Sequence, residues 1–238
     1  MLSLYYAFTA KTVNEMGGTY PVSFTKKKII GDPGICRRDP SDVIKVGDKY
    51  YVWYTKLVKA DLDYPKAEHY PSGYPGDIWY ATSPDGKQWT EQGEAIHKGS
   101  RNDFDEHGIF TPNILIVKDK YYLFYTAVRE PYVWERTPTA IGVAVADSPD
   151  GPWKKYEDNP VLVPSRLPDK FDSFRCDDTC FIVREGKYWM YYKGRPIHGN
   201  TQMGVAIAMN PTGPYMKYKD AKILHRGHEV LVWPSSGG

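Results

Sequence analysis

The sequence has few cysteines, no long apolar run and almost no net charge, and each shortage excludes a class of protein. Only three of the 238 residues are cysteine, too few for a disulfide framework, so we expect free thiols. The formal net charge is +2, from 31 basic and 29 acidic residues, which directs no strong field at nucleic acid or a membrane surface. No apolar run approaches the length that spans a bilayer. A soluble protein without nucleic-acid or membrane partners is predicted.

Two further absences concern the N-terminus and helices. The opening MLSLYYAFTAKTV has no basic start and no long apolar core, so it does not resemble a signal peptide, and we favour the cytoplasm over the periplasm. No amphipathic helical pattern of useful length occurs. The chain is therefore expected to be all-β.

Aromatic residues, by contrast, are abundant, at 15% of the chain with 20 Tyr and 7 Trp, and they mark a repeat. Three segments each combine an apolar strand, a short polar turn and an aromatic strand, the signature of a β-hairpin. Their equivalent tyrosines, Tyr50, Tyr121 and Tyr188, are 71 and 67 residues apart (121 − 50 and 188 − 121). The segments are VIKVGDKYYVWYT (43–55), LIVKDKYYLFYT (115–126) and FIVREGKYWMYYK (181–193).

A second element follows each hairpin. It consists of a strand, a Pro-Asp-Gly or Pro-Thr-Gly turn and an aromatic residue that opens a fourth strand, Trp89, Trp153 or Tyr215. Radial repetition of such four-stranded antiparallel units is a β-propeller. A β-sandwich is the alternative, but it does not require one ordered subunit three times.

The repeat length sets the domain organisation. At roughly 67 residues per unit, the chain holds about three and a half blades, whereas a closed ring needs at least four. We therefore expect residues 1–238 to form one domain, part of a five-bladed β-propeller truncated at its C-terminus. The ending HEVLVWPSSGG is typical of the opening strand of another blade.

Acidic residues recur where the blades begin. Aligned without gaps on the tyrosines, Asp39 and Asp177 both lie eleven residues before the hairpin tyrosine, and Phe110 takes that place in the second blade. The first strand of a propeller blade is innermost, so these carboxylates should converge near the channel, together with Glu229 after His228. The competing interpretation is that such acids cap turns, a structural role we assign to Asp32, Asp42, Asp103, Asp105 and Asp178.

Paired carboxylates near a channel suit glycoside hydrolysis, which needs a base to activate water and an acid to protonate the leaving oxygen. The layout resembles the five-bladed hydrolases of glycoside hydrolase family 43. The strings GICRRDPSDVIKVGDKYYVWYT, HGIFTPNI, DDTCFI and GHEVLVWP are closer to family 117, the α-1,3-L-neoagarooligosaccharide hydrolases. That resemblance implies inverting, exo-acting release of 3,6-anhydro-L-galactose.

The resemblance also assigns roles. It implies Asp39 as the base, Asp177 as the carboxylate that tunes the pKa, and His228 or the adjacent Glu229 as the acid. Family members dimerise through an N-terminal helical segment that this sequence lacks, so a homodimer is an open prediction. No cofactor is required, and no metal-ligand set is evident, although some relatives bind a cation near the site. Further candidates for sugar contacts are Arg38, His107, Thr111, Lys193, Arg195 and Trp233, with Trp134 as a second stacking ring.

Two alternative functions remain at this stage. A family 43-like arabinosidase or xylosidase would use the same acids on another sugar. A propeller that binds carbohydrate without turnover is the alternative from another class. The substrate in every case is predicted to be an oligosaccharide.

Overall fold

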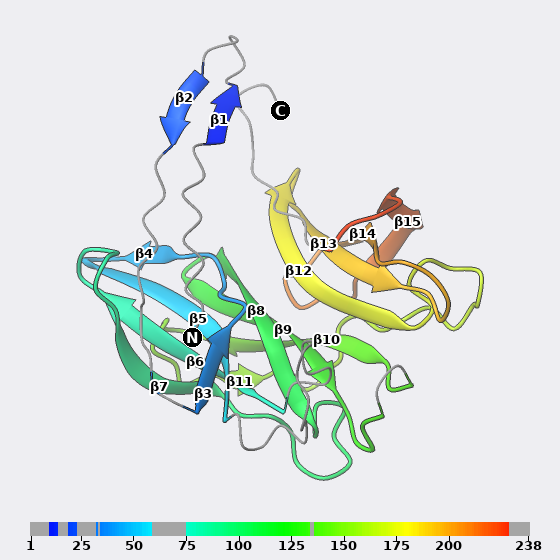
Figure 1. Cartoon of the computed structure of the whole chain (residues 1–238), viewed down its shortest axis with the longest axis horizontal. Helices are drawn as coiled ribbons and strands as arrows, with labels where there is room; N and C mark the ends of the chain where they lie inside the picture. The colour runs from blue at the N-terminus through cyan, green and yellow to red at the C-terminus, as the bar shows by residue number, and fades with distance from the viewer. Residues whose placement is uncertain are drawn as a thin grey trace.

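The computed structural model describes residues 10–13, 19–22, 32, 34–58, 75–133 and 136–228, and these residues form fifteen strands without a helix. They pair as one small hairpin and three larger antiparallel sheets (Figure 1). The hairpin is β1 (Ala10–Val13) with β2 (Thr19–Val22). No helix in the described residues is long and apolar enough to cross a membrane.

Each large sheet is one blade, with its strands in chain order from the inside outwards. In the first blade, β3 and β4 both pair with β5 and together form an interrupted innermost strand. The first blade contains β3 (Ile35–Arg38), β4 (Ile44–Val46), β5 (Lys49–Val58), β6 (Asp77–Ser83) and β7 (Thr90–Ile96). The second contains β8 (Gly108–Val117), β9 (Lys120–Val128), β10 (Thr139–Ala146) and β11 (Lys154–Lys155). The third contains β12 (Arg175–Arg184), β13 (Lys187–Arg195), β14 (Gln202–Ala208) and β15 (Met216–Leu224).

The hairpin turns have the backbone geometry that their sequences predict. Lys118 and Asp119 have φ of 48° and 64°, and Glu185 and Gly186 have φ of 52° and 70°. Two consecutive positive φ angles give a type I′ turn, whose twist matches that of the flanking strands. The four-stranded repeat and the β-propeller fold expected from the sequence are thus confirmed.

Aromatic and aliphatic side chains join neighbouring blades. Trp53 of the first blade is fully buried against Trp153 of the second, at 5.7 Å between ring centroids. Phe124 of the second blade packs at 4.2 Å from Phe181 of the third. These rings therefore hold sheet against sheet, which is the structural role that composition suggests first.

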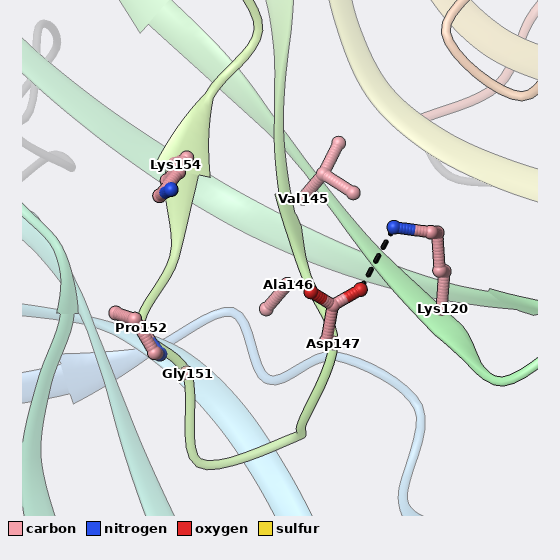
Figure 2. A pocket seen from close by; sticks show the side chains of 7 residues that line it. All are labelled: Lys120, Val145, Ala146, Asp147, Gly151, Pro152 and Lys154. Carbon is pink, nitrogen blue, oxygen red and sulfur yellow. Dashed lines mark hydrogen bonds and ion pairs between the residues drawn. The ribbon is translucent and has the colours of Figure 1, made fainter.

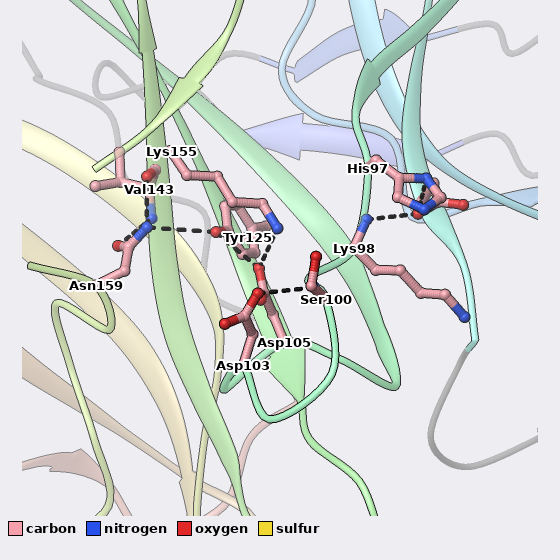
Figure 3. Close-up of polar contacts among 10 residues, drawn as sticks. His97, Lys98, Ser100, Asp103, Asp105, Tyr125, Val143, Lys155 and Asn159 are labelled. Carbon is pink, nitrogen blue, oxygen red and sulfur yellow. Dashed lines mark hydrogen bonds and ion pairs between the residues drawn. The ribbon is translucent and has the colours of Figure 1, made fainter. Parts of the chain in front are cut away.

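A buried carboxylate precedes the innermost strand in the second and third blades. Asp105 Oδ2 accepts hydrogen bonds from Tyr125 Oη at 3.2 Å and Lys155 Nζ at 2.6 Å (Figure 3). Asp172 repeats the arrangement with Tyr192 Oη at 2.9 Å and Lys217 Nζ at 2.5 Å. Each carboxylate therefore ties the segment before strand one to strands two and four of its own blade.

The cysteines carry free thiols. Cys176 and Cys180 are buried, and burial raises the pKa of Cys176 well above its ordinary value. Cys36 is only partly buried.

Candidate active site

The innermost strands of the three blades share one backbone irregularity. Pairing with the second strand is regular as far as Arg38↔Thr55, Phe110↔Thr126 and Asp177↔Lys193. The next residue in each strand leaves the regular pairing with positive φ: 50° at Asp39, 48° at Thr111 and 45° at Asp178. Non-glycine residues, and β-branched threonine above all, adopt this conformation only at a cost, and such outliers cluster at functional sites.

This geometry corrects the ungapped alignment of the repeats. Asp39 was expected to match Asp177, but the backbone pairing matches Asp39 with Thr111 and Asp178. Asp177 matches Arg38 instead. The first blade has one more residue between this point and the hairpin, which shifts the alignment by one. Asp178 therefore occupies the site position and is not merely a turn cap. We call Asp39, Thr111 and Asp178 the bulge residues.

A threonine of the preceding blade holds each of the last two bulge residues. The backbone N–H of Thr111 donates to Thr55 Oγ1 at 2.9 Å, and that of Asp178 donates to Thr126 Oγ1 at 3.1 Å. Thr55 and Thr126 occupy the same position in the second strand of their blades. Thr55 and Thr126 are buried, so the N–H groups of Thr111 and Asp178 are satisfied away from water.

Asp178 lies in a buried charged cluster. The ammonium of Lys193 donates to Asp178 Oδ2 and lies 3.8 Å from Asp177 Oδ2. Thr139 at the start of β10 donates its hydroxyl hydrogen to Asp177 Oδ1. The side chains of Asp177, Asp178 and Lys193 are each less than a tenth exposed.

Burial dominates the protonation of Asp178. It raises the pKa of this carboxyl above its ordinary value because an ionised carboxylate is poorly solvated there. The charge of Lys193 opposes that rise, the carboxylate of Asp177 adds to it, and His228 opposes it. His228, a predicted acid, therefore lies within electrostatic reach of Asp178.

Asp39 has a different environment. Its carboxylate accepts two hydrogen bonds from the guanidinium of Arg38, at 2.7 Å from Nε and 3.3 Å from Nη2. Both side chains are 20% exposed. The fork geometry fixes the orientation of the carboxylate, so Arg38 contacts and orients the candidate base.

The other predicted contact residues are spread over two blades. His107, before β8, pairs through Nδ1 with Glu130 Oε1 at 2.6 Å and stacks on Tyr132 with 4.5 Å between ring centroids. Arg195 ends β13, and its carbonyl accepts a hydrogen bond from Phe174 N. Glu229, Trp134 and Trp233 lie outside the described residues.

Two features elsewhere do not belong to the bulge site. Among the described residues, the group with cation-ligand spacing is Asp77, Glu94 and His97, on the outer strands of the first blade and in the loop that follows. A depression of about 320 Å³ lies at the hairpin end of the second blade, lined by Lys120, Asp147 and five neighbours (Figure 2). It is at the opposite end of β8 from Thr111.

Comparison with known proteins now adds to this geometry. Residues 35–179 match the sequence profile of glycosyl hydrolases family 43. The chain belongs to glycosyl hydrolase family 43. The match includes all three bulge residues.

The resemblance to family 117 is also confirmed. Zg3597, a family 117 glycoside hydrolase produced by the marine bacterium Zobellia galactanivorans, is 36% identical, with a TM-score of 0.72 over 84% of this chain and 60% of that chain. A fructan 1-exohydrolase from Cichorium intybus has the same fold at 15% identity, with a TM-score of 0.61 over 80% of this chain and 33% of its own. The arabinoxylan arabinofuranohydrolase of Bacillus subtilis (strain 168) is 25% identical over 165 residues, 64% of this chain and 29% of the relative. The chain thus spans less than two thirds of each of these proteins.

Proposed function

We propose that this protein is a glycoside hydrolase whose catalytic groups include the carboxylates of two bulge residues, Asp39 and Asp178. The observation that carries the proposal is the coincidence of Asp39 and Asp178 at one strained backbone position in two different blades. The second blade forms the same bulge with Thr111. The backbone geometry alone therefore does not require an acidic residue at this position. Family membership supports the same class of reaction.

The proposed mechanism is inversion. Asp39, oriented by Arg38, takes a proton from water as that water attacks the anomeric carbon. His228 donates a proton to the leaving oxygen, a role suited to an imidazole whose ordinary pKa lies close to neutrality. Asp178 and Asp177 provide negative charge that stabilises the developing oxocarbenium ion. In the sequence, Glu229 follows His228 as Asp178 follows Asp177, and we propose it as the acidic residue of the next blade.

The proposed substrate is a neoagarooligosaccharide, cleaved at its terminal α-1,3 linkage with release of 3,6-anhydro-L-galactose. The likeness to a family 117 glycoside hydrolase supports it, as do the strings around Asp39, Asp177 and His228. A second candidate is hydrolysis of arabinofuranosyl linkages, which the similarity to the Bacillus subtilis arabinofuranohydrolase favours. Both use the same catalytic groups on different sugars.

Substrate screening tests the proposal. The purified protein, with folding verified by a cooperative thermal transition, is incubated with neoagarobiose, neoagarotetraose and arabinoxylan. Anhydrogalactose release supports the first candidate and arabinose release the second. A folded protein that releases neither sugar contradicts the hydrolase proposal and leaves carbohydrate binding without turnover as the function. Asp39→Asn removes the base and should abolish release without changing the thermal transition.

Inversion has its own test. No covalent glycosyl-enzyme forms when water attacks directly. Intact mass measurement of enzyme quenched in acid during turnover should therefore show the unmodified mass. A sugar adduct on Asp39 would contradict inversion.

A further inference from the structure

The third blade breaks a pattern that the first two share. In β5 and β9, the residue paired with the last regular residue before the bulge is a threonine, and its hydroxyl holds the bulge residue of the following blade. In β13 that position is Lys193. Its ammonium turns instead to the carboxylates of its own blade, Asp178 and Asp177.

The lysine is therefore not a requirement of the fold. Two blades form the same strand pairing with a threonine at this position. A side chain as deeply buried as Lys193 is costly to charge unless it is paired. Its presence among two carboxylates at the proposed site calls for a chemical reason.

We propose that Lys193 is a positioning residue that fixes the charge and orientation of Asp178 for hydrolysis, an inference that rests on the proposed function. This role differs from direct sugar binding, because the ammonium is already engaged by Asp178 and Asp177. The lysine acts through the carboxylate that it holds.

The surrounding groups show why one cation matters here. Three charged or titratable groups act on Asp178. Asp177 does so from β12, Lys193 from β13, and His228 from the segment after β15. From β9, Thr126 accepts the Asp178 N–H, and from β10, Thr139 donates to Asp177. Two adjacent buried carboxylates without a cation would share one proton, as paired acids do. Lys193 favours the ionised form of Asp178 and so opposes the effects of burial and of the Asp177 carboxylate.

The test compares Lys193→Thr with Lys193→Arg. The threonine variant introduces the residue that the first two blades carry, so the backbone should accept it, and the arginine variant keeps the positive charge. In Lys193→Thr, the acidic limb of the pH profile of kcat/KM should move up by about one to two pH units. Lys193→Arg should leave the limb near its wild-type position. An equal loss of activity at every pH in both variants would indicate a structural role and overturn the inference.

A second measurement does not depend on turnover. Carbon NMR of protein with labelled aspartate carboxyls follows the titration of Asp178, whose signal is assigned by its loss in Asp178→Asn. The midpoint should rise in Lys193→Thr and stay near the wild-type value in Lys193→Arg. An unchanged midpoint in Lys193→Thr overturns the inference about the lysine alone. Inactivity of the folded wild-type protein would instead overturn the proposed function, whatever the titration shows.

Discussion

The backbone N–H of Asp178 donates a hydrogen bond to Thr126 Oγ1, 3.1 Å away in the preceding blade. Replacement Thr126→Val keeps the shape of the side chain but removes the acceptor. A buried N–H without a partner costs about 1–3 kcal/mol, and a displacement of Asp178 by about 1 Å should lower kcat roughly 100-fold. Urea unfolding and steady-state kinetics measure the two effects.

The control is Thr126→Ser, which retains the hydroxyl and should keep most of both properties. In the first blade, Thr55→Val should lose similar stability but less activity, because its partner is Thr111 and not a carboxylate. Wild-type stability and kcat in Thr126→Val would show that the hydrogen bond contributes to neither.

The corrected register predicts which of two adjacent acids matters more. Asp178→Asn should lower kcat by about 10²–10³-fold, the usual effect of removing one group that stabilises charge in the transition state. Asp177→Asn should lower it less, because Asp177 acts from the position that Arg38 takes in the first blade. Asp147→Asn, on a side chain that is 86% exposed, is the control. A larger loss in Asp177→Asn than in Asp178→Asn would return to Asp177 the pKa-tuning role that the sequence resemblance implies.

The buried carboxylates before β8 and β12 should matter for stability. Asp172→Asn leaves the ammonium of Lys217 without its counter-charge, and breaking a buried ion pair costs about 3–5 kcal/mol. Asp105→Asn should behave similarly, with a smaller effect because Lys155 is more exposed than Lys217. Urea unfolding measures both. The control Asp169→Asn, at a side chain that is 75% exposed, should change stability by less than about 0.5 kcal/mol, and an equally small change in Asp172→Asn would contradict the prediction.

A third carboxylate predicts how stability depends on pH. Burial acts to raise the pKa of Glu91, but hydrogen bonds from Arg37, Lys56 and Tyr54 outweigh it and lower the pKa to about 2. Because the folded pKa is below the ordinary 4.5, the stabilisation is complete above pH 4.5 and is lost as the pH falls towards 2.

The variant Glu91→Gln should therefore be about 2 kcal/mol less stable than wild type at pH 7. Its free energy of unfolding should also change less with pH between pH 4.5 and 2. Free energies of unfolding measured from pH 7 down to pH 2 give both results. Glu185→Gln, on a side chain that is 69% exposed, should follow the wild-type curve. Parallel curves for wild type and Glu91→Gln would contradict the assignment.

The fold was predictable from the sequence because its signals are local. The turns at Lys118-Asp119 and Glu185-Gly186, each beside an aromatic strand, specify hairpins without reference to the rest of the chain. The Phe-Asp pairs 104–105 and 171–172 were also visible, 67 residues apart (172 − 105), and this repeat would have revealed the buried carboxylates. For Asp105 the sequence predicts only a turn residue, because a lone acid in a loop gives no sign of the Tyr125 and Lys155 that surround it.

The register of the site was less accessible. Arg38 lies twelve residues before Tyr50, whereas Phe110 and Asp177 lie eleven before Tyr121 and Tyr188 (50 − 38, 121 − 110 and 188 − 177). The extra residue is absorbed between β3 and β4, where the innermost strand is interrupted. An ungapped comparison cannot detect this, because irregular pairing is a property of two strands and not of one.

The threonine hydroxyls that hold the amides of Thr111 and Asp178 make each of these two positions depend on two consecutive blades. A blade exchanged between related propellers would bring its own acidic residue. It would not bring the threonine hydroxyl of the preceding blade that accepts the backbone N–H of that residue. Such chimaeras should retain chemistry only when neighbouring blades are transferred together, so recombination and design in this architecture are best planned in pairs of sheets.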